Sequence, residues 1–436
     1  MGDSSRWSGY LQSLPFLDLP TFWNSEPSAR SNGIGPVLGS DPDNPLVLLR
    51  GSEVMKRLEK KDDAGRTLRD NVDDYYHKIV LRILRQSGIR RHLALEPSLA
   101  GFRQAYSLVS SRAFLLDAYH GLAMTPIADA FNHALENHVH IQTDFYVCPE
   151  CGSLRECEHD SEGRDQTHDM EWKANDYDAY YEMVSNADIV PYEEVFNTYG
   201  EKLCNAELLV QFGFIIDPND NDTVNFDIND ILREAPLSQE TYNKIPCLDD
   251  AELAPLLDSF TVSDLIFAQD PSNVEARFCI NCDGKISHFL WIFLVRLLCQ
   301  NMPLVGPSNS MCSDKLREMT TTQINMENML QEGSVEDGDG QLDLPGSPVI
   351  PVLLAVAQAV VAMCGARKGG SGHPGYANRD LGDILDTIAV DRSRSRLSLS
   401  ILMSEHSILD SCSFGWLDFV NAFNSSDGYN DGGISA

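Results

Sequence analysis

Two short stretches, Met124–His133 and Pro191–Phe214, constrain this chain of 436 residues more than any other feature. In the first stretch, a mostly apolar run ends in the hydrogen-bonding side chains of Asn132 and His133. In the second, Tyr199 stands in an Asn-Thr-Tyr-Gly run that leads into a helix-like apolar segment. An apolar run that turns polar at its end predicts the floor of a pocket. The alternative interpretation is an asparagine that caps a turn and an ordinary core tyrosine.

The charge of the chain limits its partners. The formal net charge is -32 and the calculated pI is about 4.5. Phosphate binding requires a basic surface, so the composition disfavours nucleic acid as a partner. A strongly acidic surface suits a basic protein substrate, although acidity is also a common means of keeping a protein in solution. The hydrophobic fraction of 43% indicates a soluble globular protein, and the length allows two or three domains.

The sequence indicates neither a targeting segment nor a membrane span. Met1–Leu19 lacks the basic region followed by an apolar core that signal and transit peptides share. The longest apolar run, Val349–Ala366, contains Pro351 and Gln358, and we expect a buried helix there. The 11 cysteines, several of them within apolar runs, indicate reduced thiols. We therefore expect the cytoplasm or the nucleus as the location and no contact with a membrane.

Apolar spacing predicts the secondary structure in outline. Apolar residues recur at three- and four-residue intervals over 68–83 and over Pro97–Ala113, which predicts two amphipathic helices. Val139–Tyr146 is expected to be a strand. Later helices are expected over Asp249–Ser259, Val274–Cys279, Ser287–Cys299, Val349–Met363 and Leu397–Cys412. The last dozen residues, Ser425–Ala436, are expected to form a disordered tail.

A cysteine-rich insert carries a possible metal site. Cys148 and Cys151 lie in a Cys-Pro-Glu-Cys-Gly run, a spacing that tetrahedral zinc favours, and Cys157 and His159 follow closely. These four residues would complete a structural zinc site that holds a loop without a core of its own. Three alternatives stay open: a ligand from His168, ligands from the second pair Cys279 and Cys282, or free thiols on an acidic loop.

The pair Asn132-His133, followed later in the chain by Tyr199-Gly200, resembles two motifs of the SET-domain protein lysine methyltransferases. The resemblance is to the branch of this family that contains the Rubisco and ribosomal-protein methyltransferases. The entry segment also resembles this family's Trp-x-x-Tyr-Leu-x-x-Leu-Pro stretch. The matching residues are Trp7, Tyr10, Leu11, Leu14, Pro15 and Trp23. Ser111-Arg112-Ala113-Phe114 resembles its Ser-Arg-x-Phe motif. Phe278–Trp291 resembles part of its substrate-binding domain.

The resemblance implies an α+β fold. It implies a SET domain over residues 1–224, with a helical insert at about 46–109 and the cysteine-rich, acidic insert at about 134–186. The small β core is expected from Ala128–Phe131, Ala187–Val190 and Val195–Tyr199. A helical substrate-binding domain over 225–424, expected to be all-α, and the tail 425–436 would follow.

The resemblance also implies the roles of individual residues. Tyr199 is expected to be catalytic and to face the target lysine. Asn132, His133 and Arg112 are expected to bind S-adenosylmethionine, and Phe212 and Phe214 to line the lysine channel. For His133 the alternative is a core histidine, and for Arg112 an ion-paired arginine at a helix end. Asp129, three residues before Asn132, is expected to brace the same turn.

Three departures from the family pattern leave a second function class open, one of them the long insert before Ala187, which carries cysteines. The family begins with a segment that carries a Gly-x-Gly loop, whereas this chain starts at the Trp-x-x-Tyr-Leu stretch and has Gly33 and Gly35 only after Trp23. Phe212 stands where the family often has a tyrosine. The leading hypothesis is a protein-lysine N-methyltransferase that acts on a basic protein. The alternatives are a non-catalytic SET-like interaction module and a zinc-stabilised scaffold.

Overall fold

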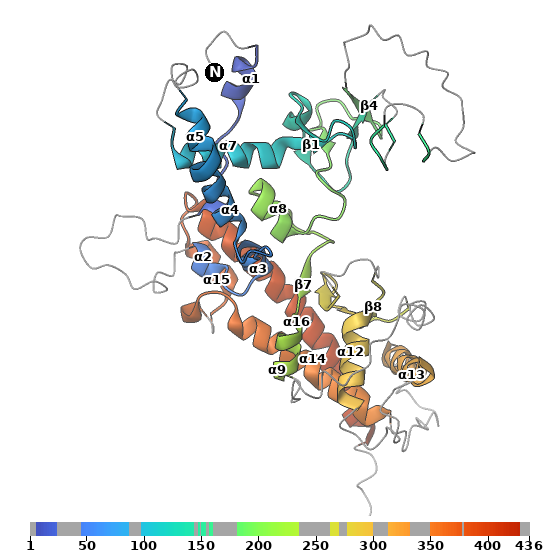
Figure 1. Cartoon of the computed structure of the whole chain (residues 1–436). Coiled ribbons are helices and arrows are strands. Elements are labelled where there is room, and N and C mark those ends of the chain that lie inside the picture. Colours follow the sequence, from blue (N-terminus) through green and yellow to red (C-terminus); the bar gives the residue numbers. More distant parts are fainter. Residues whose placement is uncertain are drawn as a thin grey trace, which may run out of the picture. The chain divides into compact units, whose positions relative to one another are not determined.

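The structure is a computed structural model (Figure 1). It describes residues 6–23, 45–86, 97–143, 147–148, 150–153, 157–159, 181–234, 262–269, 277–299, 313–331, 349–376 and 379–427. The chain forms two compact units. The first consists of Met1–Trp23, Lys60–Leu203 and Glu207–Gly213, and the second of Asn24–Glu59, Cys204–Ala206 and Phe214–Ala436. The predicted domain boundaries at residues 224 and 424 stay a prediction.

The first unit contains the two helices that apolar spacing predicts. Its helical elements are α1 (Ser8–Ser13), η1 (Pro20–Phe22), α4 (Leu68–Tyr75), the π-helical turn η2 (Tyr76–Val80), α5 (Leu81–Leu84), α7 (Leu99–Arg112) and the 3-10 turn η3 (Ala128–Ala130). Helix α4 begins with a capping box, in which the Thr67 hydroxyl accepts from the Asp70 N–H and the Asp70 carboxylate accepts from the Thr67 N–H. The helices expected over 68–83 and Pro97–Ala113 are confirmed.

Two small sheets complete the first unit. In one, β1 (Ala113–Leu115) pairs antiparallel with β2 (Leu122–Met124). The other has the order β3-β6-β4-β5, from β3 (Asn132–His133), β4 (Val139–Thr143), β5 (Tyr181–Ser185) and β6 (Phe196–Asn197). Strand β6 is parallel to both β3 and β4, whereas β4 and β5 are antiparallel. The strand expected from Val139 is confirmed as far as Thr143.

Two of the expected core strands are wrong and one is shorter than expected. Ala128–Ala130 forms the 3-10 turn η3, which starts after Ile127 adopts a φ of 78°. Ala187–Val190 is a connection without strand structure, because Tyr181–Ser185 takes the place beside β4 in a register of five residue pairs. Only Phe196–Asn197 of Val195–Tyr199 is a strand. The four-stranded sheet of the first unit therefore begins at Asn132 itself.

The second unit is mainly helical but contains a sheet. Its helices are α2 (Pro45–Leu48), α3 (Glu53–Glu59), α9 (Ile228–Glu234), α12 (His288–Cys299), α13 (Ser313–Gln331), α14 (Ile350–Gly370), η4 (Pro374–Tyr376), α15 (Leu381–Thr387) and α16 (Ser393–Asp427). Strands β7 (Thr223–Asn225), β8 (Ile266–Phe267), β9 (Cys279–Asn281) and β10 (Ile286–Ser287) form a sheet of order β7-β9-β10-β8. Helix α8 (Asn205–Phe212) begins in this unit and ends in the first.

The mixed fold class is confirmed, with corrections in the C-terminal region. This region is not all-α, because β7, β9 and β10 pair in antiparallel fashion. Cys279 is the first residue of β9, so the helix expected over Val274–Cys279 is wrong where it is described. Helix α16 extends to Asp427, so the expected disordered tail does not start at Ser425. Residues 428–436, the helix expected over Asp249–Ser259, and Gly33 and Gly35 lie outside the described residues.

The core of the second unit is packed around α12, α14 and α16. Leu290, Trp291 and Leu294 of α12 and Trp416 of α16 are fully buried in one cluster. Helix α14 is the one described helix long and apolar enough to cross a membrane by length and composition, with a mean hydropathy of 1.8. Half of the most apolar 18-residue segment of α14 is buried, and nine residues of the helix lie inside the protein. This packing agrees with the core helix expected over Val349–Ala366.

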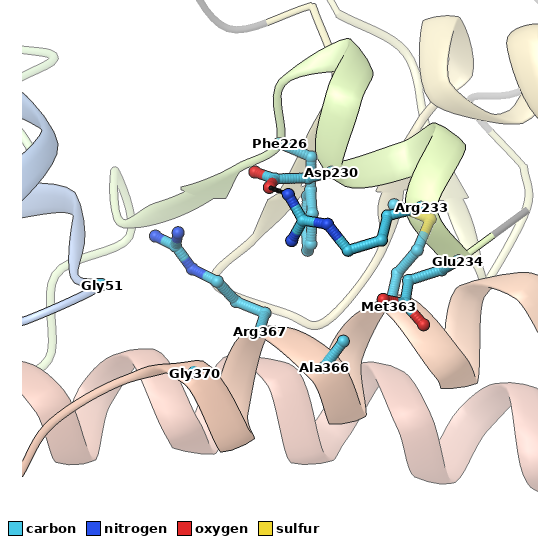
Figure 2. A pocket seen from close by; sticks show the side chains of 9 residues that line it. All are labelled: Gly51, Phe226, Asp230, Arg233, Glu234, Met363, Ala366, Arg367 and Gly370. Atoms are coloured by element: carbon cyan, nitrogen blue, oxygen red, sulfur yellow. Dashed lines mark ion pairs between the residues drawn. The ribbon is translucent and has the colours of Figure 1, made fainter. Parts of the chain in front are cut away.

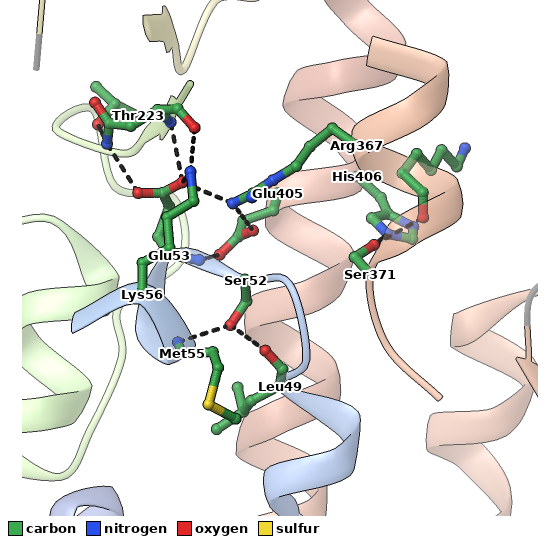
Figure 3. Close-up of polar contacts among 12 residues, drawn as sticks. Leu49, Ser52, Glu53, Met55, Lys56, Thr223, Arg367, Ser371, Glu405 and His406 are labelled. Carbon is green, nitrogen blue, oxygen red and sulfur yellow. Dashed lines mark hydrogen bonds and ion pairs between the residues drawn. The ribbon is translucent and has the colours of Figure 1, made fainter. Parts of the chain in front are cut away.

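A buried polar network ties α3 to α14 and α16 within the second unit (Figure 3). The guanidinium of Arg367 lies 2.8 Å from Oε1 of Glu53 and 4.0 Å from Oε2 of Glu405. The backbone N–H of Glu53 donates to Glu405 at 2.8 Å. Burial, followed by the neighbouring Glu53 carboxylate, raises the pKa of Glu405 to about 8.

Arg367 also lines a pocket of about 130 Å³ in which Arg233 and Asp230 form an ion pair at 3.4 Å (Figure 2).

Candidate functional site

The two motif stretches meet through a parallel strand pair in the first unit. In the register of β3 and β6, Asn132 is opposite Phe196 and His133 is opposite Asn197. The N–H of Ala134 donates to the carbonyl of Asn197 at 3.0 Å, which continues the pairing. Since Tyr199 follows β6 by two residues, it lies beside the strand that carries Asn132 and His133. Residues more than 60 positions apart in the sequence therefore form one site.

Tyr199 is held by both its backbone and its side chain. Its N–H donates to Nδ1 of His133 at 3.1 Å, and its hydroxyl donates to the carbonyl of Phe131 at 3.0 Å. The rings of His133 and Tyr199 are stacked, with centroids 5.3 Å apart and planes at 26°. These contacts orient the phenol toward the start of β3 with little rotational freedom.

The site is uncharged at neutral pH at these two residues. Burial raises the pKa of Tyr199 above its ordinary value of 10.0, so the phenol keeps its proton. Burial also lowers the pKa of His133 below 6.5. A neutral imidazole agrees with Nδ1 acting as the acceptor for the Tyr199 N–H, because the protonated ring has no acceptor nitrogen. Tyr199 and His133 therefore act in the site as oriented, uncharged dipoles.

Arg112 braces the turn that precedes Asn132. Its Nη1 donates to the carbonyl of Asp129 at 2.7 Å and lies 3.5 Å from the Asp129 carboxylate. The Tyr10 hydroxyl donates to the same carboxylate at 2.6 Å, and the pKa of Tyr10 is raised by burial and by this bond. Asp129 is 8% exposed. Tyr10 of α1 and Arg112 of α7 thus both bond to Asp129 of η3, which holds the turn before Asn132, as expected for Asp129. A direct contact between Arg112 and the cofactor stays a prediction.

Asn132 presents its amide at the surface of the site. The side chain is exposed, and its Nδ2 donates to the carboxylate of Glu194 at 2.6 Å. Glu194 lies in a loop in which Tyr192 adopts a φ of 72° and is fully exposed. This partner of Asn132 could not be predicted from the sequence, because no local pattern links residues 62 positions apart. Non-glycine residues with positive φ, such as Tyr192 and Ile127, are strained and often found beside functional sites.

Phe212 forms the other side of the tyrosine. Its ring centroid lies 4.7 Å from that of Tyr199, with the planes at 36°. Gly213 ends α8 with a φ of 84°, and its N–H donates to the carbonyls of Leu208 and Leu209. This left-handed conformation costs glycine little, whereas a residue with a Cβ atom would be strained there. Phe214 belongs to the second unit, where its side chain is half-buried, so its predicted place in a channel stays a prediction.

The cysteine-rich insert brings four possible ligands together in the first unit. The ligand atoms of Cys148, Cys151, Cys157 and His159 all lie within 4.8 Å of one another. The backbone N–H groups of Cys151 and Glu150 help to lower the pKa of the Cys148 thiol to about 7. His168 lies outside the described residues, and Cys279 is buried in β9 of the second unit.

The two stretches whose motifs resemble the SET-domain protein lysine methyltransferases lie together in the first unit, through the parallel pairing of β3 with β6 and the bond between Tyr199 and His133. Sequence comparison agrees, since the chain is 25% identical over 291 residues to "Ribosomal lysine N-methyltransferase 3" of Saccharomyces cerevisiae (strain ATCC 204508 / S288c). The alignment covers 55% of this chain and 51% of the relative, so the chain spans about half the length of this curated relative. The resemblance to the ribosomal-protein branch is therefore confirmed in sequence.

No model of a known protein family matches the chain. Among solved structures, "Structure of Rubisco LSMT bound to AdoMet" has a TM-score of 0.45 and 17% identity, and the match covers 99% of this chain and 76% of that one. "Crystal structure of the SET domain of LSMT bound to Lysine and AdoHcy" has a TM-score of 0.49 and 17% identity, with 98% and 73% covered.

Proposed function

We propose that the chain is an S-adenosylmethionine-dependent protein-lysine N-methyltransferase with Tyr199 as its catalytic tyrosine. One observation carries the proposal: the phenol of Tyr199 is fixed against the strand of Asn132 and His133 by bonds to Phe131 and His133. The name of the yeast relative, a ribosomal lysine N-methyltransferase, supports the same activity. The proposed domains are a SET domain over residues 1–224 and a substrate-binding domain over 225–424.

Lysine methylation makes demands that these residues fit. The amine has to lose a proton, which costs about 4–5 kcal/mol near pH 7 for a lysine with a pKa of about 10.4. It must then point along the axis of methyl transfer at near-attack distance. A neutral phenol is a poor general base but a good orienting dipole. The raised pKa of Tyr199 therefore supports a role in orienting the amine and stabilising the partly positive methyl group through weak C–H···O contacts.

The cofactor would be held mainly by Asn132 and His133. The exposed amide of Asn132 offers both a donor and an acceptor, and the β3 backbone at His133 offers groups that fit an adenine edge. When bound, S-adenosylmethionine supplies the methyl group as a sulfonium. Arg112, bonded to Asp129, would hold the turn before Asn132 in place. Phe212 would flank the lysine channel with its ring against Tyr199.

The substrate would be a basic protein. A net charge of -32 attracts a cationic partner and repels nucleic acid, and long-range attraction of this kind raises association rates. The name of the relative points to a ribosomal protein as the kind of substrate. The proposed location is the cytoplasm or the nucleus, with no membrane partner.

Two tyrosine variants test the proposal. We expect Tyr199→Phe to lower methyl transfer from labelled S-adenosylmethionine to a mixed basic-protein substrate by about a hundredfold, since a polar contact in a preorganised site contributes about 3–4 kcal/mol. Cofactor affinity, measured by calorimetry, should change little. Tyr75→Phe removes a phenol from the exposed face of α4 and should match the parent in both assays. Equal turnover by Tyr199→Phe and the parent would contradict the catalytic role. Failure of the parent chain to bind the cofactor would favour a non-catalytic interaction module instead.

A further inference from the structure

The four-residue cluster in the insert lies apart from the proposed chemistry and has a geometry of its own. Three pairs of its ligand atoms are at contact distance. Sγ of Cys148 and Sγ of Cys157 lie 3.9 and 3.8 Å from Nδ1 of His159, and Sγ of Cys151 lies 3.6 Å from Sγ of Cys157. Three thiols and one imidazole nitrogen therefore converge around one point.

These separations match a tetrahedral zinc centre. Zinc binds sulfur at about 2.3 Å and histidine nitrogen at about 2.0 Å, so a tetrahedral angle places neighbouring ligand atoms about 3.5–3.8 Å apart. The three pairs at contact distance are separated by 3.6–3.9 Å, and no pair of the four ligand atoms is more than 4.8 Å apart. Hard cations such as magnesium and calcium prefer oxygen ligands, whereas thiolates and imidazole select zinc. The four ligands also close the coordination shell, as in a structural site.

The local backbone supports the same geometry. The N–H of Cys148 donates to the carbonyl of Ser153 at 2.9 Å, and the N–H of Gly152 donates to the carbonyl of Cys148 at 2.8 Å. These bonds close the tight turn that carries Cys148 and Cys151. Gly152 has a φ of 71°, and a Cβ atom there would lie 2.9 Å from the carbonyl oxygen of Ala118. The turn therefore packs against the connection between β1 and β2, so the cluster is supported by other residues of the first unit.

We propose that Cys148, Cys151, Cys157 and His159 bind one structural zinc ion. On binding, the three thiols lose their protons to solvent and act as thiolates, and His159 binds through Nδ1. The ion joins the turn of Cys148 and Cys151 to Cys157 and His159, and so helps to fix these residues beside Ala118. This proposal is independent of the proposed methyl transfer, because it concerns residues that take no part in it.

Metal analysis of the full chain, purified under reducing conditions without chelator, tests the site. We expect about one zinc per parent chain and less than about a tenth of that for Cys151→Ser. Cys282→Ser is the matched control, because it removes a partly buried thiol of the second unit, one of the alternative ligands, and should retain the metal. Less than about one zinc in ten parent chains overturns the proposal, as does full zinc content in Cys151→Ser or loss of zinc in Cys282→Ser.

Cobalt substitution identifies the ligands directly. We expect the cobalt-loaded parent to show the intense visible bands of a tetrahedral site and the near-ultraviolet charge-transfer bands of three thiolates. His159→Ala should shift the visible bands while keeping the charge-transfer bands. A cobalt-loaded parent that lacks the charge-transfer bands of thiolates overturns the proposal, because three of the four proposed ligands are thiols.

Discussion

Glu405 should make the second unit less stable as the pH rises, and Glu405→Gln should remove this dependence. Glu405 is buried, with Arg367 and Glu53 as its charged neighbours and Lys56 acting at longer range (Figure 3). The backbone N–H of Glu53 donates to one of its oxygens. The amide oxygen of glutamine can accept the same hydrogen bond. The substitution therefore removes the titration while it keeps the shape and the main contact.

The sign and size of the effect follow from the two pKa values. In the unfolded chain a glutamic acid has a pKa of about 4.3. In the folded protein the pKa of Glu405 is about 8, because burial and the Glu53 carboxylate oppose its ionisation. Between these values the folded state holds a proton that the unfolded state lacks, so the free energy of unfolding falls as pH rises. One unit corresponds to about 1.4 kcal/mol, which gives a loss of about 3 kcal/mol between pH 6 and pH 9.

Denaturant unfolding at several pH values measures this dependence. Trp291 and Trp416 are fully buried in the second unit, so unfolding of this unit changes the tryptophan fluorescence of the chain. Glu405→Gln should flatten the curve between pH 6 and pH 9, and Glu318→Gln, at an exposed position of α13, should leave the parental slope unchanged. The reasoning is refuted if parent and Glu405→Gln lose stability equally over this range.

Two further predictions concern the proposed active site. Asn132→Ala should weaken S-adenosylmethionine binding about tenfold in calorimetry, since one hydrogen-bonding amide contributes about 1–2 kcal/mol, and an unchanged Kd would argue against its cofactor contact. Phe212→Tyr adds a second phenol next to Tyr199, with ring centroids now 4.7 Å apart. It should lower the number of methyl groups added per lysine by crowding the channel, as read by mass spectrometry of the product; an unchanged product distribution would place Phe212 outside the channel.

Features that depend on near neighbours in the chain were predictable from the sequence. The period of apolar residues predicted α4 and α7, and the Cys-x-x-Cys spacing predicted the convergence of Cys148 and Cys151. Both depend on contacts within a few residues, so the pattern contains the relevant physics. The Asn-His and Tyr-Gly motifs predicted that the two stretches lie together, and the structure brings His133 and Tyr199 into contact; the roles of these residues stay predictions.

Tertiary structure decided what depends on pairing between distant segments. Strand propensity alone does not select between Tyr181–Ser185 and Ala187–Val190 as the neighbour of β4, because a strand is stable only with a partner in register. The same holds for the bond between Asn132 and Glu194 and for the contact of Glu53 with Glu405, 352 residues apart. The burial that raises the pKa of Glu405 arises only when α3 and α16 pack together, so sequence determined the chemistry of the residues and the fold determined their environment.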